Sequence, residues 1–442
     1  MPSIAFITLG CKLNFSETST LARRFMEAGF ERRLPSQPSD VYVVNTCSVT
    51  EQADKKCRQA IRKLAQLNPT ALVVVTGCYA QLKPDEVAQI EGVDLVLGAD
   101  RKGNLFEYVN NLRTKGKTGG HIVSCDIGTV DSFFPAFSSG DRTRSFLKVQ
   151  DGCDYRCSYC TIPLARGKSR NSPIADLLRE AKTIAASGIR EIVLTGVNIG
   201  DFGKSTGESF FDLLRALDEV DGIERIRVSS IEPNLLTDEM IEWMALSRTV
   251  MPHFHIPLQS GCDRILALMR RHYRREVFAE RVRKIKAILP QAFIGVDVIA
   301  GFPGEREEDF HETYAFLECL TPAYLHIFPY SERPDTPASM MLDSVPKPER
   351  TARVRALNDL CSRLHQQFYV HNIGQEQRVL WESACKDGQM FGFTDNYLKV
   401  ETPYRRDLTG RLQYILITGL NAERQTATCV RREMQAMKQH QQ

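Results

Sequence analysis

Short apolar runs alternate with helix-like stretches along the first hundred residues. The runs lie at residues 4–10, 41–46, 71–77 and 94–99. Each run is continuous instead of alternating in polarity, as expected for parallel strands that are covered on both faces. After the first run, residues 16–30 have a helical period and begin near Ser16 and Thr18, which are residue types that cap helices. This pattern predicts a small doubly wound α/β domain over residues 1–112.

A second alternation begins at residue 145 and repeats six times. Its apolar runs lie at residues 145–152, 191–198, 225–233, 253–261, 293–304 and 324–331. Helical patterns separate these runs, so six β/α units with right-handed crossovers predict a partial, TIM-like (β/α)6 barrel over residues 145–370. Residues 113–144 interrupt the alternation and contain the Gly- and Lys-rich stretch RTKGKTGG. We expect this segment to link the two domains.

The last part of the chain has a third pattern. A long helical pattern at residues 347–374 ends at Gly374. Short alternating runs separated by turn residues follow it, and they predict a small antiparallel, OB-like β-barrel over residues 371–435. Aromatic and cationic residues such as Phe391 and Lys399 mix along this segment. Barrels of this kind use such surfaces to stack bases and to hold a nucleic-acid backbone.

Composition and charge narrow the class of protein. The chain has 442 residues, of which 43% are hydrophobic, and a formal net charge of +3. It is long enough for several domains with cores, and its charge allows a local basic groove for RNA. The N-terminus lacks the features of a signal peptide, and no apolar run is long enough to span a membrane. We therefore expect a cytoplasmic protein without a membrane partner, whose 13 cysteines are thiols or metal ligands.

Three cysteines stand close together after the first strand of the predicted barrel. In KVQDGCDYRCSYCTIP, Cys153, Cys157 and Cys160 follow the spacing C-x3-C-x2-C. A structural zinc site needs four ligands, and no fourth Cys or His is near in sequence. An iron–sulfur cluster with four irons (4Fe-4S) that is held by three thiolates leaves one iron open. The spacing therefore favours such a cluster, with its open iron available to a substrate or cofactor.

Three further cysteines each follow one of the first three apolar runs. They are Cys11, Cys47 and Cys78. Parallel strands end at one edge of a sheet, where doubly wound folds place their ligands, so the three thiols can converge there. One interpretation is that they are small buried residues at strand ends. Their matching positions favour the other interpretation, in which they are ligands of a second cluster.

Polar residues lie near the ends of the predicted barrel strands. The candidates for binding a cofactor are Asn198, Ser230, Glu232, Gln259, Asp297 and Tyr330. Such side chains either hydrogen-bond a bound molecule or cap the following helices. Arg166, Lys168 and Arg170 follow Cys160 in the sequence, and they either neutralise a carboxylate or phosphate or form a solvated loop. The basic stretch 269–286 is typical of a solvated helix face, and beside a site that acts on RNA it would contact phosphate.

These motifs together resemble a known family. C-x3-C-x2-C after the first strand of a six-unit barrel is similar to the radical S-adenosylmethionine superfamily. The other motifs resemble its methylthiotransferases over essentially the whole chain: TLGCKLN, NTCSVTEQADKK, TGCYAQ, DGCDYRCSYCTIPLARGKSR, LTGVNIGDFG, PLQSGCDRILALMRRHY, DVIAGFPGE and FPYSERPDTPA. The terminal barrel resembles their RNA-binding TRAM module. The N-terminal motifs resemble the subgroup that acts on N6-threonylcarbamoyladenosine beside the anticodon of some tRNAs.

The resemblance implies a function and its cofactors. It implies a 4Fe-4S cluster on Cys153, Cys157 and Cys160 as the catalytic centre, and a second cluster on the N-terminal triad. S-adenosylmethionine would be both the radical source and the methyl donor, and the strand-end residues would hold it. The product would carry CH3–S on C2 of the modified adenine. This chemistry belongs to the cofactors because an unreactive C–H is beyond ordinary side chains.

The resemblance also implies partners, and it leaves alternatives open. The implied partners are the anticodon stem-loop of tRNA and an electron donor such as a flavodoxin or ferredoxin, while the sulfur source is unknown. Within the family, the alternatives are isopentenyladenosine in tRNA and a side chain of a ribosomal protein. An alternative of another class is a zinc-stabilised RNA-binding protein without radical chemistry.

Overall fold

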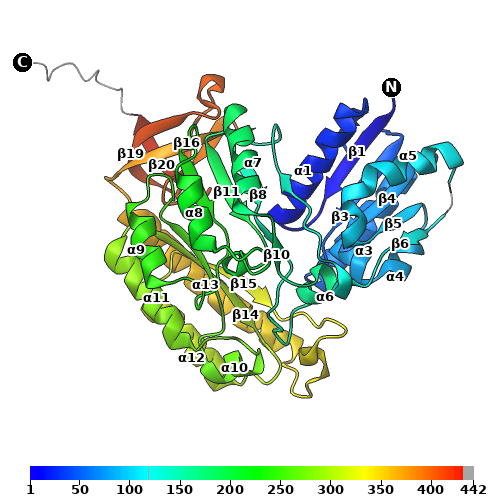
Figure 1. Ribbon diagram of the computed structural model, residues 1–442. Helices are drawn as coiled ribbons and strands as arrows, with labels where there is room; N and C mark the ends of the chain where they lie inside the picture. Colours follow the sequence, from blue (N-terminus) through cyan, green and yellow to red (C-terminus); the bar gives the residue numbers. More distant parts are fainter. Residues whose placement is uncertain (118, 432–442) are drawn as a thin grey trace, which may run out of the picture.

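The computed structural model describes residues 1–117 and 119–431, so residues 432–435 of the predicted C-terminal barrel lie outside the described residues. Figure 1 shows three parts: an N-terminal lobe built on a sheet, a central barrel, and a small β-barrel at the C-terminal end. The predicted combination of a doubly wound α/β domain, a partial (β/α)6 barrel and a β-rich C-terminal part is confirmed. The predicted division at residues 112, 144 and 370 stays a prediction.

The N-terminal lobe is a parallel sheet with helices on both faces. Its strand order is β2-β1-β3-β4-β5-β6. Apolar side chains of β3 alternate, so that Val41 and Val43 pack with α1 and α5 on one face while Tyr42 and Val44 pack with α2 on the other. The elements are β1 (Ser3–Thr8), α1 (Lys12–Glu27), β2 (Glu31–Arg33), β3 (Val41–Thr46), α2 (Glu51–Leu67), β4 (Leu72–Gly77), α3 (Cys78–Leu82), α4 (Pro84–Ala88), β5 (Leu95–Leu97), η1 (Ala99–Asn104), α5 (Leu105–Lys115) and β6 (His121–Val123).

Two features of this lobe differ from the expectation. Helix α1 begins at Lys12 and has Cys11 as its N-cap, so the predicted start near Ser16 or Thr18 is wrong. The early start is stabilised by Asn14, whose Nδ2 donates hydrogen bonds to the carbonyl oxygens of Leu9 and Thr46. The sheet also continues into the segment that was expected to be a connection, because β6 pairs with β5 in parallel.

The central part contains the six predicted parallel strands. β8, β11 and β12 form one parallel sheet with the antiparallel β7 at its edge, and β13, β14 and β15 form another. Parallel bridges between Ile226 and Val250 and between Ser230 and His255 connect the two sheets. The elements are η2 (Ile127–Thr129), β7 (Ala136–Phe137), β8 (Ser145–Lys148), β9 (Gln150–Asp151), α6 (Ile162–Arg166), β10 (Arg170–Asn171), α7 (Ile174–Ala186), β11 (Glu191–Thr195), η3 (Ile199–Asp201), α8 (Phe210–Asp218), β12 (Arg225–Val228), α9 (Asp238–Leu246), β13 (His253–Gln259), α10 (Asp263–Leu268), α11 (Arg275–Ile288), β14 (Phe293–Ala300), α12 (Glu307–Leu320), β15 (Tyr324–Pro329), η4 (Pro337–Met340) and α13 (Lys347–His371).

Along each barrel strand, side chains point alternately outward to the surrounding helices and inward to the interior of the barrel. Alternate residues such as Ile192, Ile256 and Val296 pack against the surrounding helices in one large apolar cluster. The residues between them, such as His255 and Asp297, are partly exposed and face the barrel interior. The open side of the barrel, at β7 and β8, is in contact with α1 of the N-terminal lobe. The interior therefore adjoins the edge of the N-terminal sheet.

The C-terminal part is a closed barrel with strand order β16-β17-β18-β20-β19. Its pairings are antiparallel except for β18 with β20, which are parallel. This barrel covers the N-terminal end of β12, because Arg225 and Arg227 donate hydrogen bonds to the carbonyl oxygen of Thr394 at 2.8 and 2.6 Å. The elements are β16 (Glu376–Lys386), β17 (Gln389–Thr394), β18 (Lys399–Pro403), η5 (Arg406–Leu408), β19 (Leu412–Asn421) and β20 (Thr426–Arg431).

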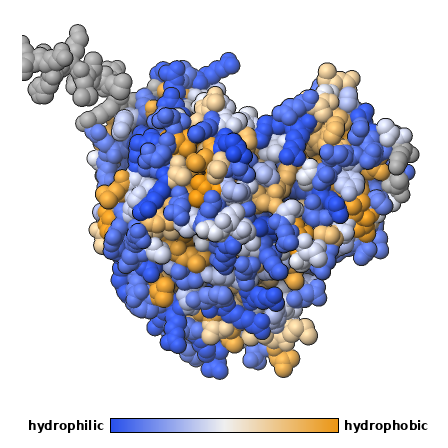
Figure 2. All heavy atoms as spheres, in the orientation of Figure 1, coloured by the Kyte–Doolittle hydropathy of each residue, from blue (hydrophilic) through white to orange (hydrophobic). Residues whose placement is uncertain are grey.

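The surface is mostly hydrophilic. Figure 2 shows charged and polar residues over most of the visible face, with smaller apolar areas and an indentation between the N-terminal lobe and the rest of the molecule. Within residues 1–117 and 119–431, no helix combines the length and the apolar character that crossing a membrane requires.

Candidate active site

The loop with Cys153, Cys157 and Cys160 follows β9 and is fixed by backbone contacts. Gly152 has φ +70°, and a Cβ atom there would lie 1.9 Å from the carbonyl oxygen of Lys168, so only glycine fits. The next residue, Cys153, donates its backbone N–H to Gly167 at 3.0 Å. The local sequence therefore forms a rigid turn that presents the three thiols after the first barrel strands.

A buried arginine contacts this triad. Nη1 of Arg271 lies 3.1 Å from Sγ of Cys157, and the same guanidinium forms an ion pair with Glu232. The Arg271 side chain is only 3% exposed. For this residue, the prediction that the stretch 269–286 forms a solvated helix face or contacts phosphate is therefore wrong. Burial, together with the charges of the neighbouring cysteines, raises the pKa of Cys153 and of Cys160 to about 12. Binding of a metal cluster would therefore release protons.

The predicted cofactor-binding residues lie in different surroundings. Asn198 is buried after β11, its backbone N–H donates to Oε1 of Gln150 at 2.9 Å, and its own Oδ1 has no hydrogen-bond partner among the described residues. Gln259 ends β13 with φ +68°. Tyr330 packs 5.5 Å from the ring of Phe302 in a separate apolar cluster. The unpaired amide oxygen makes Asn198 a suitable ligand for a bound molecule.

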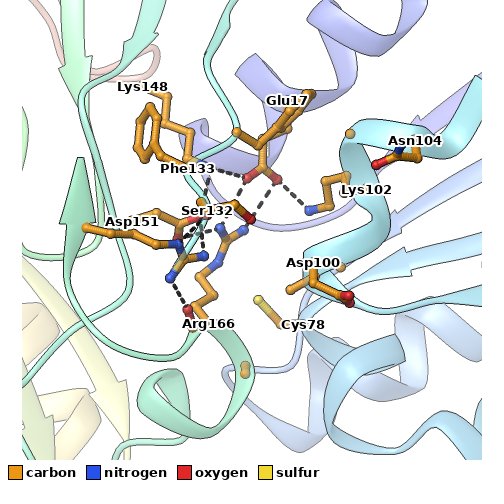
Figure 3. Close-up of a pocket in the computed structure, with 16 residues that line it drawn as sticks. Glu17, Cys78, Asp100, Lys102, Asn104, Ser132, Phe133, Lys148, Asp151 and Arg166 are labelled. Carbon is orange, nitrogen blue, oxygen red and sulfur yellow. Dashed lines mark hydrogen bonds and ion pairs between the residues drawn. The ribbon is translucent and has the colours of Figure 1, made fainter. Parts of the chain in front are cut away.

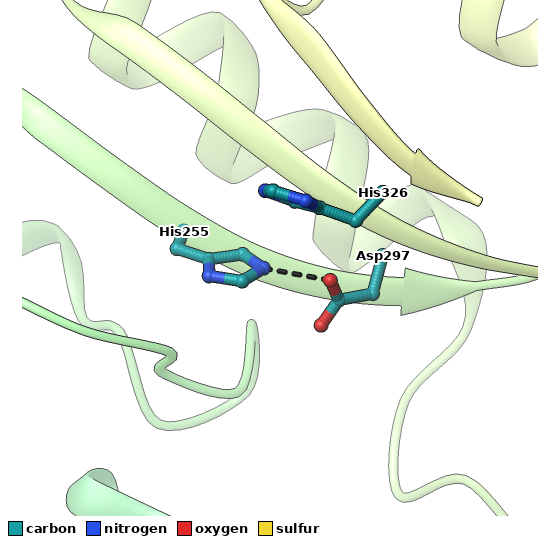
Figure 4. Close-up of side chains that lie close together, drawn as sticks. All are labelled: His255, Asp297 and His326. Carbon is teal, nitrogen blue, oxygen red and sulfur yellow. Dashed lines mark hydrogen bonds and ion pairs between the residues drawn. The ribbon is translucent and has the colours of Figure 1, made fainter. Parts of the chain in front are cut away.

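Three residues on adjacent strands meet inside the barrel. Nε2 of His255 lies 2.7 Å from Oδ1 of Asp297, and the His326 ring lies 4.8 Å from that of His255 (Figure 4). Ser230, which was also predicted to bind a cofactor, pairs with His255 through a backbone bridge. Burial and the neighbouring His255 lower the pKa of His326 to about 4, so its imidazole is neutral near pH 7. The group can donate and accept hydrogen bonds at the polar edge of a base.

The N-terminal triad lies at one edge of the N-terminal sheet, as predicted. Cys47 and Cys78 directly follow β3 and β4, and Cys11 comes three residues after the end of β1; these strands are neighbours in the sheet. Burial, together with the charges of Cys78 and Cys11, raises the pKa of Cys47 to about 12. Cys11 is also the N-cap of the long helix α1, whose positive end favours a negatively charged group.

Neither cysteine triad has the close spacing of a preformed zinc site. Thiolates on one tetrahedral zinc ion lie about 3.8 Å apart. Two groups of Cys, His, Asp or Glu residues in the described ranges have ligand atoms that all lie within 4.8 Å of one another, and neither group contains a cysteine of the triads. In a 4Fe-4S cluster each thiolate binds a different iron, which requires a wider separation.

A buried ionic network connects the two cysteine regions. Glu17 of α1 binds Lys102, Lys148 and Arg166 at 2.6, 2.8 and 3.2 Å. Asp151 binds Lys148, Arg166 and Arg170 at 2.7, 2.9 and 3.3 Å. Four cations face two carboxylates, so this network carries excess positive charge. The alternative of a solvated loop is wrong for Arg166 and Arg170, which are buried here, while Lys168 is exposed.

The network borders a cavity of about 190 Å³ that is also lined by Cys78 (Figure 3). Burial alone would raise the pKa of Glu17, but Arg166, Lys102 and Lys148 outweigh it and hold this pKa well below its usual range. Arg166 also opposes the burial that raises the pKa of Cys78. Glu17 and Lys148 were not predicted from the sequence as part of the site. The available signal was a lysine inside the apolar strand SFLKVQ, where an unpaired charge would be unstable.

Comparison with known proteins agrees with this geometry. Residues 147–317 match the radical SAM superfamily, and residues 3–98 match the uncharacterized protein family UPF0004. The threonylcarbamoyladenosine tRNA methylthiotransferase MtaB of Bacillus subtilis (strain 168) is 41% identical over 425 residues, which cover 94% of each chain. The protein of the same name from Aquifex aeolicus (strain VF5) is 39% identical over 94% of this chain and 100% of its own.

Further relatives have a different substrate in their names. The tRNA-2-methylthio-N(6)-dimethylallyladenosine synthase of Thermobifida fusca (strain YX) is 35% identical over 84% of this chain and 76% of its own. Among solved structures, the radical S-adenosylmethionine methyltransferase TsrM from Kitasatospora setae superposes with a TM-score of 0.60 at 15% identity, covering 77% of this chain and 75% of that one. At that identity the likeness shows the fold alone.

The fold and the C-x3-C-x2-C loop define a radical S-adenosylmethionine enzyme. More specifically, the chain belongs to the radical S-adenosylmethionine methylthiotransferase family. Membership implies S-adenosylmethionine and a 4Fe-4S cluster as cofactors. Family membership therefore contradicts the alternative of a zinc-stabilised RNA-binding protein without radical chemistry.

Proposed function

We propose that this enzyme methylthiolates C2 of N6-threonylcarbamoyladenosine next to the anticodon of tRNA. The observation that carries the proposal is the presence of two cysteine triads at strand ends in two adjoining parts of the chain. The acceptor is supported by the relatives from Bacillus subtilis and Aquifex aeolicus, whose names state this substrate and which cover 94% of the chain.

We assign the two triads to two 4Fe-4S clusters, one on Cys153, Cys157 and Cys160 and one on the N-terminal triad. When bound, these groups together with S-adenosylmethionine supply the one-electron and sulfur chemistry that an unreactive C–H requires. The chain supplies the surroundings. Arg271 places a buried positive charge against Cys157, and the network around Glu17 places excess positive charge beside Cys78. Both favour negatively charged, thiolate-bound groups.

The barrel interior offers polar contacts for S-adenosylmethionine and the base. Asn198, with its unpaired Oδ1, and Glu232, which Arg271 orients, are the best supported candidates for the cofactor. Gln259 is the last residue of β13, and Ser230 comes two residues after the end of β12. The group of His255, Asp297 and His326 is suited to the polar edge of the adenine. Tyr330 packs in an apolar cluster, and its buried hydroxyl has no hydrogen-bond partner among the described residues, so it is a candidate on the same ground as Asn198.

The C-terminal barrel is proposed to bind the anticodon stem-loop. Tyr404 and Tyr414 are 41% and 58% exposed, and Nζ of Lys399 lies 4.5 Å from the centre of the Phe391 ring. Exposed aromatic rings beside cations stack bases and hold phosphates. A flavodoxin or ferredoxin is proposed as electron donor, and the sulfur source stays open.

The proposal is tested by mass spectrometry of nucleosides from tRNA of bacteria that lack their own enzyme and express this chain. The expected product is 2-methylthio-N6-threonylcarbamoyladenosine, which should be absent with Cys157→Ala. The relative from Thermobifida fusca favours isopentenyladenosine as a second candidate substrate. Appearance of only the methylthio-isopentenyl nucleoside would support that candidate. A methylthiolated ribosomal protein with unmodified tRNA would overturn both.

A further inference from the structure

A second cavity, of about 340 Å³, lies where the three parts of the molecule meet. We name it the Cys11 cavity, because Cys11 at the end of β1 forms part of its wall. Val193 of β11 and His253 of β13 line it from inside the central barrel, and Tyr397 lines it from the C-terminal barrel. Its volume is within the range of small-molecule sites. It therefore joins the N-terminal cysteine region to the barrel interior.

The charged residues in the wall of the Cys11 cavity are all cations. They are Lys12, Arg142, Arg144 and Arg227. Two are already paired, since Arg144 binds Glu382 at 2.7 Å and Arg227 binds Glu191 at 2.9 Å. Lys12 and Arg142 have no carboxylate within 4.0 Å in the part of the chain that the structure describes. Their charges are thus available to an anionic ligand.

Two buried polar atoms in the wall of the Cys11 cavity lack hydrogen-bond partners among the described residues. Nδ1 of His253 and Nε of Arg144 have no hydrogen bond within residues 1–117 and 119–431. His253 is 7% exposed, and the Arg144 side chain is 10% exposed. Buried polar atoms are nearly always paired in folded proteins, so unpaired ones in a cavity wall indicate a polar ligand. The guanidinium of Arg142 lies 4.7 Å from the centre of the Phe15 ring, which holds its plane in place.

We propose that the Cys11 cavity binds the carboxylate-bearing group on N6 of the substrate adenine, with Arg142 and Lys12 as the residues that recognise it. This inference rests on the proposed function. A guanidinium binds a carboxylate through two parallel hydrogen bonds, and lysine adds a compact charge. Because an uncharged N6 group would leave both cations without a partner, the cavity would select against it.

A phosphate of the tRNA backbone has the same charge as this carboxylate. The wall, however, also contains the rings of Phe15, Phe146 and Tyr397 and the side chain of Val193. Aromatic and aliphatic surface is suited to the body of a modified base, whereas backbone phosphates are bound by open polar grooves. The composition of the wall therefore favours the carboxylate.

The test uses the full-length, anaerobically reconstituted enzyme and fluorescently labelled anticodon stem-loops that differ in one group. One stem-loop carries threonylcarbamoyladenosine, and the other carries the same group with its carboxylate converted to a neutral amide. The wild type should bind the acid about tenfold more tightly than the amide, as expected for hydrogen bonds to a charged group. Arg142→Met and Lys12→Met should reduce this ratio towards one, and Arg142→Lys should retain part of it. Arg179→Met is the matched control, because the Arg179 side chain is exposed on α7. This variant should leave the acid-to-amide affinity ratio unchanged.

Equal affinity of the wild type for acid and amide would overturn the inference. Weakening of both stem-loops by the same factor in Arg142→Met would also overturn it, because that result assigns the contact to phosphate. Iron content is measured in every variant, so that loss of a cluster is distinguished from loss of recognition. An enzyme that shows the tenfold ratio but does not methylthiolate the acid stem-loop would refute the proposed function and leave the subsite intact.

Discussion

At the scale of single residues, the two cysteine regions are surrounded by buried charges that the local sequence does not explain. Glu17 lies on the buried face of α1 and faces three cations. Burying ions is costly unless each finds partners, so the network is stable only as a unit. Its excess positive charge lies beside Cys78, which is where an anionic cluster is proposed. The network thus serves both the contact between domains and the cysteine site.

Replacing Glu17 with glutamine should destabilise the protein by about 3–5 kcal/mol, because three buried cations lose their shared anion. The midpoint of urea unfolding, followed by tryptophan fluorescence, measures the loss. Glu27→Gln makes the same chemical change at an exposed position of the same helix and should change stability by less than about 0.5 kcal/mol. Similar midpoints for the two variants would contradict a structural role of the network.

At the scale of elements, the N-terminal cysteines are placed by turns at strand ends. Gly77 connects β4 to α3 with φ +100°, and a Cβ atom there would lie 2.4 Å from the carbonyl oxygen of Thr46. The side chain of Thr46 in turn donates to the carbonyl oxygen of Thr76 at 2.6 Å. The close approach of β3 and β4 at this turn brings Cys78 to the same edge as Cys47.

The variant Gly77→Ala should therefore lose stability and also lose iron at the N-terminal triad. Gly116→Ala is a matched control, because Gly116 has nearly the same φ, +88° against +100°, but no atom of the described residues lies within 4 Å of a Cβ built there. Backbone strain alone costs about 1–3 kcal/mol and is common to both variants. Differential unfolding and iron analysis compare them. Full iron content in Gly77→Ala would show that this turn does not position Cys78.

The sequence predicts these elements well where the signal is local. Continuous apolar runs identify the parallel strands, and the position of each cysteine after a run places both triads. Contacts between distant residues are not readable in this way. Arg271 reaches Cys157 across 114 positions, and Lys148 reaches Glu17 across 131. A charged residue in a sequence is ordinarily expected to be exposed to solvent. Only the three-dimensional packing shows that Arg271, Lys148 and Glu17 are buried.

At the scale of the whole molecule, the three parts enclose one region. The N-terminal lobe contacts the open side of the barrel at β7 and β8, and the C-terminal barrel covers its N-terminal end through Arg225 and Arg227. The Cys11 cavity has walls from all three parts. A molecule bound there would contact Cys11 on one side and Val193 and His253 of the central barrel on the other.

Iron and sulfide analysis of the anaerobically reconstituted protein tests the two-cluster proposal most directly. The wild type should contain about eight irons per chain, and the triple Cys→Ala variants of either triad about four each, since each cluster contains four irons. Zinc should be absent at stoichiometric levels. A wild type with about four irons, unchanged when Cys11, Cys47 and Cys78 are replaced, would contradict the proposal.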